Sequence, residues 1–250
     1  MSSELSTLAA AVLLALFAGA GSKGGGSSSS GDGAGGEEAA FAEARARMVE
    51  TQIVARGVRD PRVLDAMRAV PRHRFVPEHL RDAAYDDSPL PIDFGQTISQ
   101  PYIVAAMTEA LRPAPGDVVL DVGTGSGYQA AVLARLVKRV ISIEILAPLA
   151  ERARATLAEL GVDNVEVRVG DGWQGVPAGA PYAGILVAAA PDVVPPALLE
   201  QLAVGARLVI PVGDSYDQEL RIVTRTARGY ETETLFGVRF VPLVPGEDER

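Results

Sequence analysis

The sequence predicts an α/β fold with an open, mostly parallel sheet, and three observations support this prediction. Over residues 118–212, short runs rich in Val, Ile and Leu alternate with helical patterns, which is typical of strands covered by helices on both faces. A glycine-rich turn, G-T-G-S-G at residues 123–127, follows the first strand and precedes a helix. After Gly213 the alternation stops, and two adjacent strand patterns predict antiparallel strands at one edge of the sheet.

Composition and charge exclude several classes of function. The chain has 250 residues, 48% hydrophobic and 22% charged, as expected of a globular protein with a substantial core. Its net charge is -9, and because phosphate binding needs a basic face, we expect no nucleic-acid partner. The absence of cysteine excludes disulfides and thiol catalysis. His73 and His79 have no clear third ligand, so no metal site is predicted, and we expect His73 to brace its loop through hydrogen bonds.

The first 20 residues resemble a leader segment. An apolar run from Leu8 to Ala20 has the length of a signal peptide and is too short to span a bilayer. It ends in an Ala-x-Ala cleavage pattern, although Glu4 and the lack of a preceding Lys or Arg weigh against export. The protein is therefore expected to be periplasmic or secreted if the leader functions and cytoplasmic otherwise, without stable membrane insertion of its folded part.

Residues 21–36 are rich in glycine and serine and predict a flexible linker. The folded domain is then expected to cover residues 37–250. It opens with extra helices, at residues 37–57 with Gly57 as C-cap and at Pro61–Ala69 with Asp60 as N-cap. A proline-rich, irregular segment of about 30 residues, 70–100, follows, and such long loops are usually functional.

A further amphipathic helix is predicted from Pro101 to Leu111, before the alternating region. The strands of that region are predicted at residues 118–122, 140–143, 165–169, 185–189 and 208–212, with helices at 128–136, 148–160 and 196–202. Two edge strands are expected at residues 220–226 and 232–241.

The spacing of the glycines restricts the ligand that the turn can hold. A phosphate-binding P-loop needs Lys followed by Ser or Thr, where this chain has Tyr128 and Gln129. A dinucleotide fingerprint, G-x-G-x-x-G, would place its third glycine at Tyr128. The glycines instead stand at Gly123, Gly125 and Gly127, which favours a ligand lying over the turn.

Two acidic residues further restrict which ligand the turn can hold. Glu144 ends the second strand, 21 residues after Gly123, where a carboxylate can bind both ribose hydroxyls. Asp171, before Gly172, follows the third strand and could accept from an adenine amino group. Both stand at the carboxyl ends of parallel strands, where ligands bind in open sheets. Taken singly they fit a solvated strand end or a turn former, but together with the glycines they describe a site for S-adenosylmethionine.

A second motif adds a resemblance to a family. The stretch G-Q-T-I-S-Q-P-Y at residues 95–102, with V-P-R-H-R-F-V-P at 70–77 and L-V-I-P-V-G at 208–213, resembles the protein-L-isoaspartate O-methyltransferases. The resemblance runs from roughly residue 49 to residue 243. It implies a Rossmann-like methyltransferase fold and a monomer.

The resemblance also implies an activity and a set of site residues. The family methylates the free α-carboxylate of L-isoaspartyl residues in damaged proteins and peptides, with S-adenosylmethionine as cofactor. Ser99 corresponds to the hydroxyl of the active site. The cofactor-binding positions that it implies are Thr97, Ile98, Ser99, Gly123, Gly125, Gly127, Glu144, Asp171, Gly172 and Gln218.

The chemistry fits these residues. A carboxylate, with a pKa of ~4, is ionised at neutral pH and can attack a sulfonium methyl without a general base. Catalysis then rests on alignment, with reacting atoms about 3–3.5 Å apart. Ser99 would orient the acceptor carboxylate by hydrogen bonding, and its alternative role is to cap the helix that begins at Pro101.

Two positions depart from the family pattern. Ala183 stands where the family usually has aspartate, and Ala188 where threonine is common. Two alternatives to this reaction stay open. One is a methyltransferase of the same fold that acts on another carboxylate or a small molecule. The other, suggested by Ala183, is a non-catalytic S-adenosylmethionine binder.

Overall fold

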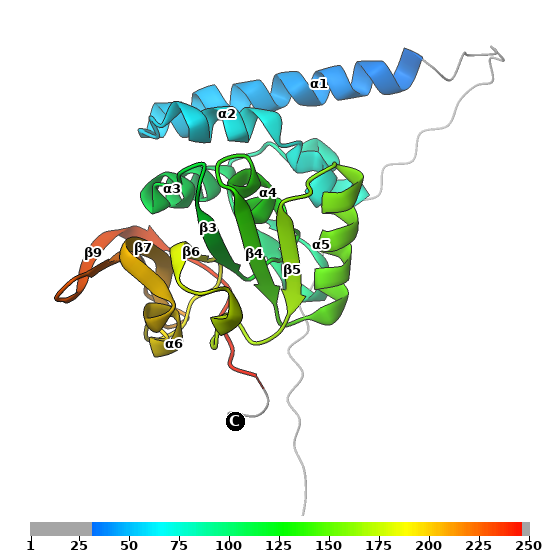
Figure 1. Cartoon of the computed structure of the whole chain (residues 1–250). Helices are drawn as coiled ribbons and strands as arrows, with labels where there is room; N and C mark the ends of the chain where they lie inside the picture. The colour runs from blue at the N-terminus through cyan, green and yellow to red at the C-terminus, as the bar shows by residue number, and fades with distance from the viewer. Residues whose placement is uncertain (1–31, 247–250) are drawn as a thin grey trace, which may run out of the picture.

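The computed structural model describes residues 32–246. Within them a seven-stranded sheet has the order β5-β4-β3-β6-β7-β8-β9 (Figure 1). Its strands are β3 (Val118–Val122), β4 (Arg139–Glu144), β5 (Val165–Val169), β6 (Tyr182–Val187), β7 (Leu202–Gly213), β8 (Gln218–Thr226) and β9 (Gly229–Val238). The strands β3 to β7 run parallel, and β8 and β9 continue the sheet antiparallel at one edge. The predicted mixed α/β sheet is confirmed.

The strand order places a binding position at the end of β3. The chain passes from β3 to β4 on one side, whereas β6 pairs with the other side of β3. Val122 is in register with Ile143 and with Val187, so the turn after β3 lies beside the ends of both neighbours. Such reversals of strand order are where open sheets bind ligands.

Helices cover the two faces unevenly. They are α1 (Asp32–Met48), α2 (Pro61–Ala69), α3 (Pro101–Leu111), α4 (Tyr128–Ala134), α5 (Ala147–Glu159) and α6 (Pro196–Glu200). In Figure 1, α1 and α2 run above α3 and α4, on the side away from α6. The core on their side includes Val119 and Val140, while Leu120 and Ile141 face a second core that contains Leu198 of α6. No helix among the described residues is long and apolar enough to cross a membrane.

The first helix begins earlier than predicted. It starts at Asp32, inside the segment expected to be linker, and not at residue 37. Adding a residue to an existing helix is far easier than nucleating one, so the Ala- and Glu-rich run can extend over Gly35 and Gly36 despite their low propensity. The helix continues through a π turn and a 3-10 turn and ends at Gly57, whose φ is 99°, as the predicted C-cap requires. The expected leader, residues 1–20, and most of the expected linker lie outside the described residues.

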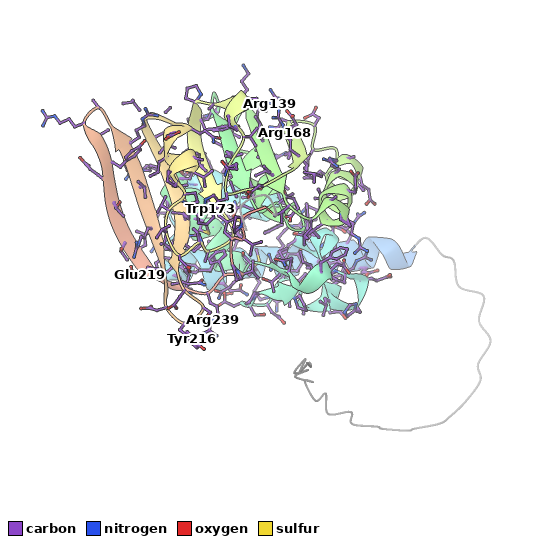
Figure 2. The ribbon with its side chains drawn as sticks, turned by 90° about the horizontal axis from the view of Figure 1, so that it is seen from below. Arg139, Arg168, Trp173, Tyr216, Glu219 and Arg239 are labelled. Atoms are coloured by element: carbon purple, nitrogen blue, oxygen red, sulfur yellow. The ribbon has the colours of Figure 1, made fainter. Side chains whose placement is uncertain are left out.

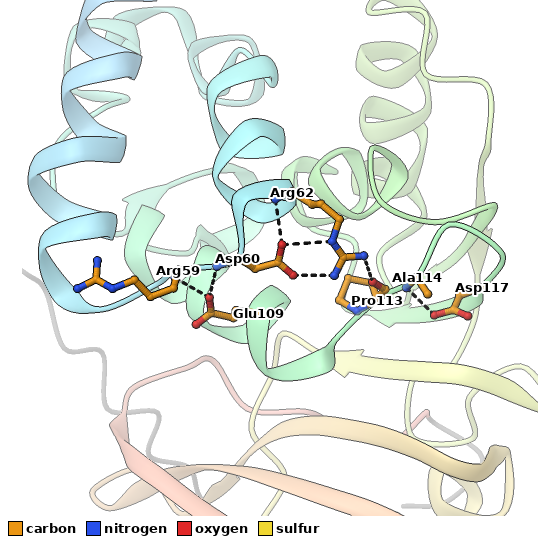
Figure 3. Close-up of polar contacts among 7 residues, drawn as sticks. All are labelled: Arg59, Asp60, Arg62, Glu109, Pro113, Ala114 and Asp117. Carbon is orange, nitrogen blue, oxygen red and sulfur yellow. Dashed lines mark hydrogen bonds and ion pairs between the residues drawn. The ribbon is translucent and has the colours of Figure 1, made fainter.

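A polar network joins α2 to α3 (Figure 3). Asp60 caps α2 by accepting from the N–H of Arg62 at 2.9 Å, as predicted, and the hydrogen bond from the Arg62 side chain lowers the pKa of Asp60. Glu109 of α3 accepts from the N–H groups of Arg59 and Asp60, both at 2.6 Å. Arg62 also donates to the carbonyl of Pro113 at 2.8 Å. The start of α2 is thereby fixed against the end of α3.

The segment predicted as an irregular loop is more regular than expected. It contains 3-10 turns at Arg72–Phe75, Glu78–Ala83 and Asp93–Gly95, and a two-stranded sheet of β1 (Leu90–Pro91) and β2 (Thr97–Ile98). Short 3-10 turns carry little periodicity, which is why the pattern missed them.

His73 braces this segment, as expected. Its Nδ1 lies 2.8 Å from the hydroxyl of Tyr85, and its ring stacks on Phe41 of α1 with 4.1 Å between centroids. Its Nε2 lies 3.3 Å from the carboxylate of Glu38. Burial lowers the pKa of His73. The histidine thus holds the loop and α1 together.

The strand β7 also begins earlier than predicted, at Leu202 instead of residue 208, and takes the last predicted residue of α6. Leu202 pairs with Tyr182 of β6, but the register then shifts between Tyr182 and Gly184. Gly205 has a φ of 87° in this stretch. A local irregularity of this kind breaks the apolar run that identifies a buried strand, so the pattern showed only its second half.

Candidate functional site

A cavity opens beside the glycine turn, at the carboxyl ends of β3 and β4. Its volume is about 1030 Å³ with the open mouth included. Of the predicted site residues it is lined by Thr97, Ile98, Ser99, Gly123, Gly125, Glu144 and Gly172. The segment 96–99 and the turn 123–126, far apart in sequence, therefore form walls of one cavity.

The turn needs glycine at the predicted positions. The φ angles of Gly123, Gly125 and Gly127 are 88°, 53° and 89°, a left-handed region that disfavours other residues. The N–H groups of Gly123 and Thr124 both donate to the carbonyl of Ile143, at 2.9 and 3.2 Å. The backbone of the turn is thus held against the end of β4.

Glu144 presents a buried carboxylate to the cavity. One oxygen accepts from the N–H of Gly125 at 2.8 Å and the other from the N–H of Leu146 at 3.1 Å. Its side chain lies against the cavity and is 6% exposed. Each carboxylate oxygen can accept a further hydrogen bond, so Glu144 can still receive donors from a ligand such as a pair of hydroxyls.

Asp121 is a buried acid that the sequence analysis did not assign. It is wholly buried in β3 and accepts from the hydroxyl of Ser142 at 2.7 Å, and the oxygen of Thr124 lies 2.6 Å from that of Ser142. Burial raises the pKa of Asp121 to about 7. Its Oδ1 has no hydrogen-bond partner among the described residues. An acid inside an apolar strand, two residues before the first glycine of the turn, was the signal that could have identified it.

Three predicted site residues do not line this cavity. Gly127 is the N-cap of α4, and a Cβ there would lie 3.3 Å from the Cβ of Ala153 on α5. Asp171 accepts from the N–H groups of Trp173 and Gly246, at 2.8 and 2.9 Å. Gly127 thus lets α4 pack closely against α5, and Asp171 ties Gly246 to the loop after β5. Contact of either residue with a cofactor stays a prediction.

Gln218 is the third of these residues, and its amide is engaged with the backbone. Its Oε1 accepts from the N–H of Phe240 at 2.7 Å, and its Nε2 donates to the carbonyl of Phe240 at 3.3 Å. Gln218 lines a second cavity that adjoins the first.

The second cavity has a volume of about 1200 Å³ with its open mouth. It shares Thr97, Ser99, Ala188 and Val241 with the first cavity. Ser99 therefore stands where the two cavities meet, and its hydroxyl has no hydrogen-bond partner within residues 32–246. The N-cap of α3 is Gln100 and not Ser99, so the capping alternative is wrong and the hydroxyl is available to a ligand.

No group of three or more His, Asp or Glu residues in the described part of the chain could hold a metal ion. The arrangement instead offers the carboxylate of Glu144 and backbone groups around one cavity, and a free hydroxyl where this cavity meets the second. Such a site can bind a ligand rich in donors and align it with a second molecule.

Comparison with known proteins identifies the family. A family model described as protein-L-isoaspartate(D-aspartate) O-methyltransferase (PCMT) matches residues 43–248. The chain belongs to this family. A protein-L-isoaspartate O-methyltransferase of Synechococcus sp. (strain JA-2-3B'a(2-13)) is 60% identical over 211 residues, covering 82% of this chain and 86% of the relative. Protein-L-isoaspartate O-methyltransferase 1 of Rhodopseudomonas palustris (strain HaA2) is 57% identical over 213 residues, covering 84% and 87%.

Solved structures of the same kind share the fold. A protein-L-isoaspartate O-methyltransferase superposes with a TM-score of 0.71 at 27% identity, covering 80% of this chain, while this chain spans 65% of that one. A putative protein-L-isoaspartate O-methyltransferase from Plasmodium falciparum, in complex with S-adenosyl-L-homocysteine, gives a TM-score of 0.69 at 26% identity, covering 80% and 98%. The expected methyltransferase fold is confirmed.

The two departures from the family pattern lie in different places. Ala188 lines both cavities, and its Cβ lies 3.7 Å from the position that a Cβ on Gly123 would take. Ala183 lies in β6, partly buried, and lines neither cavity. A smaller residue at position 188 therefore changes the wall near Ser99, while the residue at 183 touches no wall.

Proposed function

We propose that this chain transfers a methyl group from S-adenosylmethionine to the free α-carboxylate of L-isoaspartyl residues in damaged proteins and peptides. The observation that carries the proposal is the place of Ser99, whose free hydroxyl stands between a cavity suited to the cofactor and a second cavity open to an acceptor. Membership of the family supports the same reaction.

The residues of the first cavity suit S-adenosylmethionine. Its ribose hydroxyls would donate to Glu144, whose oxygens retain free lone pairs. Gly172 also lines this cavity. Only a glycine fits there, because a Cβ would lie 2.6 Å from the side chain of Val122 on β3. When bound, the cofactor supplies a methyl group on a positively charged sulfur.

The residues at the junction suit an anionic acceptor that needs no base. Thr97, Ser99, Ala188 and Val241 are all uncharged, so none of them forms an ion pair that would weaken the carboxylate as a nucleophile. The hydroxyl of Ser99 can donate to one carboxylate oxygen and leave the other free to react. Ile98, which is 4% exposed, helps to exclude water beside it. Alignment in a dry site accounts for rate enhancement without proton transfer.

A paired-substrate assay tests the proposal. The purified chain is incubated with radiolabelled S-adenosylmethionine and an isoaspartyl peptide, beside its twin with normal aspartate. We expect label in the isoaspartyl peptide alone. Label in neither peptide, with cofactor binding intact, would contradict the proposal and favour a non-catalytic binder. Label in small carboxylic acids or in the normal twin would favour a methyltransferase with another acceptor.

Two further proposals concern the state of the protein. We expect a monomer, which light scattering of the purified chain would test. Export is tested by N-terminal sequencing of the native protein: a mature start near Gly21 supports a periplasmic or secreted protein, and an intact start supports a cytoplasmic one.

A further inference from the structure

The mouth of the second cavity carries two side chains that the proposed reaction does not use. Arg239 follows the end of β9, and Tyr216 lies in the turn between β7 and β8 with 88% of its surface exposed. Both line the cavity that also reaches Ser99. Figure 2 shows their labels at the same end of the molecule.

The charge of Arg239 is uncompensated, unlike that of Arg56 in the same cavity. The guanidinium of Arg56 lies 3.2 Å from the carboxylate of Asp87 and 3.5 Å from the centroid of the Tyr102 ring. Arg239 forms no hydrogen bond or ion pair with any residue in the range 32–246. A single free cation therefore faces the cavity beside one that is already paired.

Neighbouring acids do not neutralise Arg239. Asp217 lines the same cavity but forms no ion pair with it in the described part of the chain. Glu219, on the adjacent strand, is paired with Arg221 at 2.9 Å. The guanidinium is thus free to meet an anion that enters from solvent.

The backbone presents both side chains from fixed positions. Gln218 holds Phe240, the residue after Arg239, through its two amide hydrogen bonds. Asp214 accepts from the N–H groups of Tyr216 and Asp217, at 2.7 and 2.9 Å. Rigid supports of this kind make surface side chains selective, because less conformational entropy is lost on binding.

We infer that Arg239 and Tyr216 form an acceptor-recognition rim that favours peptides with an acidic side chain beside the isoaspartyl residue. The inference rests on the proposed function, since it assigns the second cavity to the peptide. The overall charge of -9 would by itself repel such peptides, so a preference for them must come from local charge. Arg239 supplies the cation, and Tyr216 supplies an exposed aromatic surface for the peptide chain.

Three isoaspartyl peptides that differ only in the neighbouring residue, Glu, Gln or Lys, test the charge preference. We expect kcat/KM to be about two- to fivefold higher for the Glu peptide than for the Gln peptide, the range of an exposed ion pair. The difference should lie in KM and should shrink as salt is added. Arg239→Gln should abolish it, and Arg239→Glu should favour the Lys peptide.

A matched control separates local from general charge effects. Arg228→Gln removes the same charge at the other end of the β8–β9 hairpin, where the side chain has no partner among the described residues. This variant should keep the preference for the Glu peptide. Tyr216→Ser should raise KM for all three peptides about equally and leave their ranking unchanged.

Each outcome decides the inference separately from the reaction. Equal kcat/KM for the Glu and Gln peptides in the unchanged protein overturns it. An equal loss on all peptides in Arg239→Gln also overturns it, because the arginine would then contact the isoaspartyl carboxylate itself. If no peptide is methylated, the proposed function fails, and fluorescence-polarisation titration of the same labelled peptides still decides whether Arg239 selects the acidic neighbour.

Discussion

The carboxylate of Glu144 accepts a hydrogen bond from the N–H of Gly125 at 2.8 Å. This contact joins the end of β4 to the middle of the glycine turn. The same side chain lines the cavity proposed for the cofactor. One residue therefore both shapes the turn and presents acceptors to a ligand.

Glu144→Gln should weaken cofactor binding more than folding. The amide keeps the size of the side chain and one oxygen for Gly125, but it loses the charge and one acceptor. Hydrogen bonds to charged groups are worth about 1.5–3 kcal/mol, so affinity for S-adenosyl-L-homocysteine should fall about tenfold or more in calorimetry. Glu43→Gln, on the exposed surface of α1, is the control, and equal affinity in both variants would contradict the assignment.

Ser99→Ala should reduce turnover while cofactor affinity stays within about twofold. The hydroxyl caps no helix and lies at the junction of the two cavities, so its loss should affect the acceptor. We expect kcat on an isoaspartyl peptide to fall about tenfold or more, as for a lost hydrogen bond to a charged group. Parallel losses of turnover and of cofactor affinity would instead indicate a structural serine.

Asp121 should make stability depend on pH. Its pKa is raised from 3.8 to about 7, so between these values the folded state holds a proton that the unfolded chain releases. Its contribution is therefore complete below about pH 4 and is lost as pH rises through about 7. Asp121→Asn has no such proton, so the free energy of unfolding should fall less between about pH 5 and pH 8.

Urea unfolding at several pH values measures this difference. Asp163→Asn, at an exposed site, serves as the control and should keep the slope of the unchanged protein. Identical slopes for Asp121→Asn and the unchanged protein would show that Asp121 is ionised in the folded state at all these pH values.

Gly127→Ala should destabilise the fold without removing the cofactor site. A left-handed φ costs a non-glycine residue about 1–2 kcal/mol, and the new methyl would also lie 3.3 Å from Ala153. Gly205→Ala has nearly the same φ, 87°, but meets nothing within 4 Å. Thermal unfolding should show the larger loss for Gly127→Ala. If Gly127→Ala instead kept normal stability but lost cofactor affinity, Gly127 would have to contact the cofactor directly.

Local signals made parts of the fold predictable. Asp60 followed by Pro61 predicts both the cap and the first turn of α2, and the helix has the predicted bounds. The strand β5 also matches, since nothing interrupts its short run. The start of α1 was wrong because composition suggested a linker, and the start of β7 was wrong because an irregularity interrupts its pattern.

The sequence predicted those site residues whose role depends on the local backbone conformation. It predicted less well those whose side chains bond to residues far away in the sequence. Gly123 and Gly125 need positive φ angles whatever surrounds them. Asp171 and Gln218, by contrast, reach Gly246 and Phe240, which are 75 and 22 residues away in sequence. No local pattern reports such pairings, and the burial that raises the pKa of Asp121 likewise depends on the complete fold.

The bond from Gly246 to Asp171 has a practical consequence for anyone producing the protein. Leu243 and Val244, just before it, line the first cavity, and Leu243 also donates to the carbonyl of Ala190. A tag fused close after Gly246 therefore lies next to a wall of the cavity proposed for the cofactor, so its effect on cofactor affinity should be compared with that of the untagged protein.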